Sequence, residues 1–176
     1  PIVDFINADN HSQWRYLTFG FGDQFAYLNL LTKATTLDGS YHTARTLPEL
    51  RNSGVGQVDT SYWALNGMTA IVPILQKSGE HSVRWGFVNL KTLEAVKIRW
   101  GKIHRSPFVP ILEELGWTKI KTLSNGVWIY ENPNAMVFTP TPIPTVPPIN
   151  SFAWGVFPML AFVTTVSLGM LSICPI

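Results

Sequence analysis

Charged side chains disappear from this sequence well before its end. Glu131 is the last acidic residue, and no Lys, Arg or His follows it. The preceding region carries 13 Lys and Arg against 11 Asp and Glu, which gives a formal charge of +2. Because this charge is small and no arginine-rich stripe is present, we expect no nucleic-acid partner.

Cysteine is nearly absent, since Cys174 is the single one. A disulfide framework within the chain and a thiolate zinc site are therefore excluded. Histidine is also sparse, and the four histidines have no second ligand at helical or strand spacing. We expect no metal site from them: His11, His42, His81 and His104.

Motifs that carry catalysis are missing as well. The sequence has no phosphate-binding Walker loop, no His-Glu-x-x-His and no Gly-x-Ser-x-Gly. The stretch Gly20-Phe21-Gly22-Asp23-Gln24-Phe25 has Phe25 where a dinucleotide-binding loop needs its third glycine, so we predict a turn at the end of a strand there. We assign no catalytic residue and no cofactor to this chain.

The uncharged C-terminal region predicts a membrane anchor. A bilayer core about 30 Å thick needs roughly 20 apolar residues in a helix, and residues 152–174 meet that length without a charge. Hydroxyl side chains within it, such as Thr164 and Thr165, can bond to the helix's own carbonyls. Trp154 lies at the entry end, where its ring suits the headgroup layer. The alternative is a buried core helix.

Proline dominates the region before this segment, with six prolines between Pro133 and Pro148. Proline favours extended chain, so residues 133–150 are predicted to be a semi-rigid stalk, followed by a membrane segment at 151–176. No Lys or Arg lies near the start of the apolar segment, which favours the extracytoplasmic side of the membrane for the charged region. The sequence begins at Pro1 and stops directly after the apolar run, so we expect a piece of a longer protein.

Residues 1–132 are long enough for one domain with a hydrophobic core. The clearest element is a β-hairpin at 119–131, because Asn125-Gly126 lies between two apolar strands. Before it, Pro107 opens an apolar stripe that Gly116 closes, which predicts a short helix. A helix at 69–77 and a strand at 82–88 precede that helix. The order of helix, strand, helix, strand, strand predicts an α+β (mixed α/β) domain with helices on one face of a small sheet.

The N-terminal third is less regular. Residues 14–21 are predicted to form a strand, and residues 24–31 fit either a helix or a second strand. Residues 39–56 have the composition of a loop, in which residues 47–51 could form a short helix. The triplet Asn10-His11-Ser12 fits the pattern of a glycosylation acceptor.

The richest polar run, at 36–45, gives the main candidate binding residues. Asp38 and His42 could bond sugar hydroxyls, and Arg45 could hold a phosphate. The alternative is a turn in which Asp38 caps backbone amides. Trp14 and Arg15 are second candidates, in a cluster with Asp23, although Arg15 and Asp23 could simply pair with one another or with solvent. A basic run at 91–105 could touch anionic headgroups, or it could be a solvated face.

Four stretches carry a family resemblance. Residues 14–24 read WRYLTFGFGDQ, residues 36–45 read TLDGSYHTAR, residues 115–117 read LGW and residues 127–133 read VWIYENP. In these stretches the sequence resembles the soluble part of polytopic membrane proteins that are catalogued as 6-pyruvoyl-tetrahydropterin-synthase-related and look like glycosyltransferases acting on lipid-linked sugars.

The resemblance implies a final transmembrane helix and an extracytoplasmic domain that serves recognition. It does not imply pterin chemistry, because the zinc-binding histidine set of the pterin synthase is absent. The acidic residues that catalyse sugar transfer would lie in a preceding multi-helix region, so none is carried over to this chain. Expected partners are membrane lipid, other membrane helices or subunits, and a lipid-linked sugar. The rival hypothesis is an accessory subunit with a single anchor, docking on a membrane complex through exposed aromatic residues.

Overall fold

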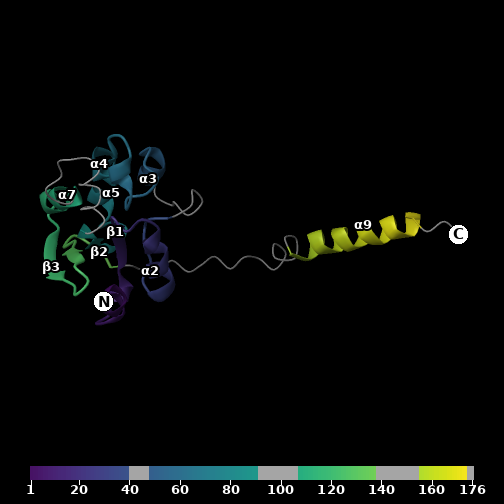
Figure 1. Cartoon of the computed structure of the whole chain (residues 1–176), viewed down its shortest axis with the longest axis horizontal. Coiled ribbons are helices and arrows are strands. Elements are labelled where there is room, and N and C mark those ends of the chain that lie inside the picture. The colour runs from purple at the N-terminus through teal and green to yellow at the C-terminus, as the bar shows by residue number, and fades with distance from the viewer. Residues whose placement is uncertain (40–47, 91–106, 138–154, 174–176) are drawn as a thin grey trace. The chain divides into compact units, whose positions relative to one another are not determined.

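The computed structural model describes residues 1–39, 48–90, 107–137 and 155–173. The chain divides into two compact units, Pro1–Thr139 and Pro140–Ile176. We call the first unit the body. It is a mixed α/β domain built around a four-stranded sheet, as the sequence predicted (Figure 1).

The sheet is partly parallel and partly antiparallel. Its strand order is β1-β2-β4-β3, with β1 parallel to β2 and the other neighbours antiparallel. Because β1 and β2 are parallel, their carboxyl ends lie at the same edge of the sheet, which we call the carboxyl edge. The strands are β1 Arg15–Phe19, β2 Val83–Val88, β3 Thr118–Thr122 and β4 Trp128–Glu131.

Helices cover both faces of this sheet, so the expectation of helices on one face was wrong. One hydrophobic core packs α5 Val72–Lys77 and α7 Phe108–Glu114 against one face, and the other packs α1 Ile2–Asn7 and α2 Phe25–Leu31 against the opposite face. The physical reason lies in β1, where residues 16–19 are all buried rather than alternately exposed. Figure 1 shows β1 and β2 between α7 and α2.

The C-terminal half of the body follows the predicted order of elements. The hairpin of β3 and β4 forms, and Gly126 takes a φ of 85° in its turn. The helix after Pro107 also forms, with Gly116 at a φ of 82° beyond its end. The helix predicted at 69–77 is instead two pieces, α4 Gly67–Ala70 and α5, because Pro73 has no amide hydrogen for the carbonyl four residues earlier.

In the N-terminal third, the ambiguous stretch at 24–31 is the helix α2, and the short helix at 47–51 appears as α3 Pro48–Asn52. Helix α1 was not predicted. Three short 3-10 helices complete the described body: η1 His11–Gln13, η2 Gly22–Gln24 and η4 Ser61–Trp63.

The second unit contains the helix α9 Phe157–Ile173, which has 17 residues and no charged side chain. Side chains from 155 to 168 are exposed. The hydroxyls of Thr164, Thr165 and Ser167 each donate to a carbonyl one turn earlier, at 2.8 Å. Among the described residues, no helix meets the combined length and hydropathy that we require of a membrane span.

Candidate functional site

A short parallel contact carries Asp38 to the carboxyl edge. Thr36 pairs with Tyr16 of β1 as an isolated parallel bridge, and the Thr36 hydroxyl donates to the Tyr16 carbonyl at 2.8 Å. Two residues further along each segment, Asp38 therefore lies level with Thr18. The sequence thus brings a predicted binding residue to the end of β1.

Asp59 holds the loop that follows β1. Its carboxylate accepts the Phe21 amide at 3.0 Å and the Gly22 amide at 2.6 Å, while its carbonyl accepts the Gly20 amide at 3.0 Å. Gly20 and Gly22 have φ values of 82° and 57°, a conformation that glycine adopts without strain. These contacts fix the loop at residues 20–22 to one buried residue, through its carboxylate and its backbone carbonyl.

Asp38 in turn holds Asp59. The Asp59 amide donates to Asp38 Oδ2 at 2.9 Å. The two side chains are buried, with exposed fractions of 4% for Asp38 and 0% for Asp59. Within the described parts of the chain, Asp38 Oδ1 has no hydrogen-bond partner. We call Asp38 and Asp59 together the carboxylate pair.

The environment of the carboxylate pair disfavours the ionised form of both carboxyl groups. Burial raises the pKa of Asp38 to about 6, and the nearby Asp59 carboxylate adds to this rise. Burial also raises the pKa of Asp59, although the Phe21 and Gly22 amides act in the opposite direction. Two buried carboxylates so close together destabilise the folded protein when both are ionised. Residues with strongly shifted pKa values at the end of a strand are candidates for a functional site.

Because the carboxylate pair is buried, it acts by positioning the loop at residues 20–22 and not by contacting a ligand. The next residues, Asp23 and Gln24 in η2, are exposed and carry the polar groups that ligands contact. Ligands of open α/β sheets commonly bind beyond the carboxyl ends of parallel strands. A loop whose backbone is fixed by buried carboxylates can present Asp23 and Gln24 in a defined orientation.

Two of the other predicted residues lie at the opposite end of β1. Arg15 is the first residue of β1, about 13 Å from its end at about 3.3 Å per residue, and Trp14 directly precedes it. Trp14 is buried, and the Arg84 guanidinium lies 4.8 Å from its ring centroid. Arg15 is half-buried, and its Nη1 donates to the His81 carbonyl at 3.4 Å. His42 and Arg45 lie outside the described residues, as does the basic run at 91–105.

Asp59 was not predicted from the sequence. It stands between Val58 and Thr60, and no neighbouring motif indicates that its carboxylate binds amides 37 and 38 positions away. The only available signal was indirect, because a glycine loop such as residues 20–22 needs acceptors for its amides.

A groove of about 500 Å³ lies elsewhere on the body, between the N-terminal segment and the β3–β4 hairpin. Asp4, Asp9, His11 and Lys121 are among the residues that line it. Of the predicted binding residues that the structure describes, Asp38, Trp14 and Arg15 do not line this groove. In the described ranges, no three His, Cys, Asp or Glu side chains are grouped as metal ligands.

Comparison with known proteins gives no further assignment. No protein-family model matches the chain, and neither the curated proteins nor the solved structures include a significant match.

Proposed function

We propose that this chain is the extracytoplasmic recognition domain of an integral membrane protein related to glycosyltransferases that use lipid-linked sugars. The observation that carries this proposal is the carboxylate pair beneath the loop at 20–22. Burial raises the pKa of Asp38 to about 6, so its ionised form lowers the stability of the fold at neutral pH, and a residue kept at such a cost is a candidate for a functional role. Catalysis of sugar transfer is assigned to another part of the membrane protein.

Membrane anchoring by residues 152–174 belongs to this proposal. It is supported by the absence of charge after Glu131 and by the exposed apolar side chains of α9. The three hydroxyl groups that bond back to helix carbonyls remove polar donors that lipid could not satisfy. The extracytoplasmic side is supported by the lack of Lys and Arg before the apolar segment.

Recognition at the carboxyl edge is supported by the position of Thr36 and Asp38, the described charged and hydroxyl residues at the start of the polar run at 36–45. Asp38, the first charged residue of this run, lies beside the loop that Asp59 fixes. His42 and Arg45 follow it within seven residues, and a guanidinium is the side chain best suited to a phosphate. Sugar hydroxyls and a prenyl phosphate are the groups that such residues would bind.

The test is a titration of the full chain in lipid nanodiscs with a water-soluble, short-chain prenyl phosphate sugar. Amide chemical shifts of residues 20–24 should change on binding, and those of α1 should not. Asp38→Ala and Arg45→Ala should each weaken binding about tenfold or more. Asp4→Ala, which removes an exposed carboxylate from α1, is the matched control and should bind as the wild type does.

Two results would contradict the proposal. One is an unchanged affinity in both variants, measured on protein whose circular dichroism shows it to be folded. The other is binding that shifts amides only around the groove at Asp4 and Lys121, which would place recognition at that groove.

A second candidate function is that of an accessory subunit docked on a membrane complex. The observation that favours it is the outer side of α2, where Tyr27, Leu30 and Leu31 are 72%, 82% and 58% exposed. Uncharged exposed side chains at this spacing suit a contact with another protein. Purification from native membranes distinguishes the two functions, since only the subunit retains companions in fixed proportion.

A further inference from the structure

The most exposed apolar side chain of the described body belongs to a loop between η4 and α4. Leu65 is 93% exposed, and Trp63, two residues earlier, is 51% exposed. No charged residue occurs from Thr60 to Gln76. Large apolar groups exposed within an uncharged stretch of the chain are candidates for contact with another apolar phase.

The segment of residues 61–66, which comprises η4 and the loop before α4, is held in its shape by backbone hydrogen bonds. The Trp63 amide donates to the Thr60 carbonyl at 3.1 Å, and the Ala64 amide donates to the Ser61 carbonyl at 3.0 Å. Asn66 adopts the left-handed conformation with φ of 57°. The next residue, Gly67, is packed so closely that a Cβ there would lie 1.9 Å from the Ser61 carbonyl oxygen. The fold therefore fixes the loop with Leu65 pointing outward.

We propose that residues 61–66 form a second contact with the phospholipid bilayer. Trp63 and Leu65 enter the boundary between headgroups and acyl chains, where an amphipathic indole ring and a leucine are both favoured. This inference rests on the proposed anchoring of the chain by residues 152–174.

Because the anchor keeps the body close to the bilayer, a weak contact by residues 61–66 is enough to orient the body. Residues 138–156 join the described body to α9, and at most about 3.5 Å per residue they span roughly 65 Å. A body tethered within that distance meets the bilayer at a high effective concentration, so two side chains are enough to bias its orientation. The lack of charge from 60 to 76 favours lipid over a protein partner, because protein interfaces usually add a charged or polar rim.

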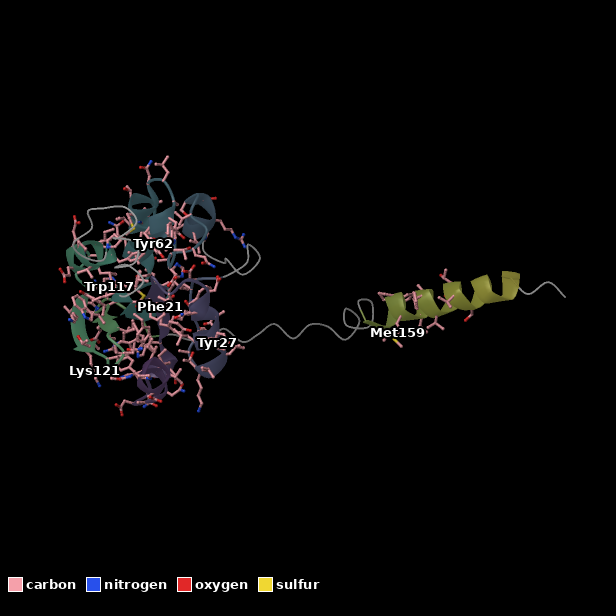
Figure 2. All side chains as sticks on the ribbon, viewed as in Figure 1. Phe21, Tyr27, Tyr62, Trp117, Lys121 and Met159 are labelled. Carbon is pink, nitrogen blue, oxygen red and sulfur yellow. The ribbon has the colours of Figure 1, made fainter. Side chains whose placement is uncertain are left out.

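The test uses the full chain with Cys174→Ser and one introduced cysteine, reconstituted in phosphatidylcholine vesicles with brominated acyl chains. A bimane label on Leu65→Cys should be quenched by the bromine atoms. Leu30→Cys on α2 is the matched control, since Leu30 is an exposed leucine of the same body. Tyr62 and Tyr27, which neighbour these positions in sequence, lie in separate regions of the body (Figure 2). The label at position 30 should stay unquenched.

A label on Leu160→Cys in α9 separates failure of the inference from failure of the anchor. Quenching at 160 and 65, but not at 30, supports the inference, and adding Trp63→Ala should then reduce the quenching at 65. Quenching at 160 but not at 65 overturns it, as does equal quenching at 30 and 65. Absence of quenching at 160 rejects the anchor, and with it the inference.

Discussion

The two ends of β1 hold polar side chains in opposite ways. At its start, the Arg84 guanidinium lies over the Trp14 and Trp85 rings and pairs with Glu131, so a charge is surrounded by favourable partners. At its end, the carboxylate pair is buried, and burial raises both pKa values. The start of the strand is therefore arranged for stability, whereas the end keeps the Asp38 carboxylate at the expense of stability.

This difference explains why two residues that the sequence proposed for binding, Trp14 and Asp38, lie in different environments in the structure. Trp14 was predicted as a second candidate for substrate binding, but in the structure its ring lies in a hydrophobic core under a guanidinium. Asp38 was predicted in the same role, and it belongs to a buried unit that controls an exposed loop. Removal of the Trp14 ring and neutralisation of Asp38 should consequently change stability with opposite signs.

The largest effect is expected for Trp14→Ala. Removal of the buried ring leaves a cavity and takes away the surface beneath Arg84, so the free energy of unfolding should fall by about 3–5 kcal/mol. Urea denaturation at neutral pH measures this change. Trp63→Ala is the control, because half of that side chain is already exposed, and it should cost less than about 1 kcal/mol. A similar loss in both variants would show that the start of β1 is not specially stabilised.

Asp59→Asn should have the next largest effect. Asparagine offers one acceptor oxygen, and its amide group would face a backbone N–H that the carboxylate now binds. We expect a loss of about 2–3 kcal/mol and faster hydrogen exchange at Phe21 and Gly22. Asp23→Asn, in the exposed part of the same loop, should change stability by less than about 0.5 kcal/mol. Unchanged exchange at Phe21 would mean that the loop does not depend on Asp59.

Asp38→Asn should be stabilising at neutral pH. The folded protein has an Asp38 pKa of about 6, whereas the ordinary value is 3.8, so between these pH values only the folded state holds the proton. Wild-type stability therefore falls as pH rises from about 4 to 6, and the loss persists above pH 6. The variant lacks this titration, and we expect it to be about 1–2 kcal/mol more stable at pH 7.5. Denaturation curves from pH 4 to 8 test this, and parallel curves for both proteins would refute it.

The sequence predicted local elements better than their arrangement. The Asn125-Gly126 turn and the limits of α7 depend on neighbouring residues, so short-range rules found them. The second layer of helices and the Asp59 contact depend on residues far apart in the chain. Asp38 was identified as a candidate because polar residues cluster around it, but its burial follows from the parallel bridge between Tyr16 and Thr36. No short-range pattern encodes that bridge.

The smallest effect is expected for Arg15→Lys, at the start of the strand. The hydrogen bond to the His81 carbonyl is long, and lysine keeps both the charge and most of the apolar stem. Stability should change by less than about 1 kcal/mol, and binding of the prenyl phosphate sugar should match the wild type. The same nanodisc titration measures this binding beside Asp38→Ala. If Arg15→Lys lost binding while Asp38→Ala kept it, recognition would belong to the start of β1. The carboxylate pair would then have to be explained by folding alone.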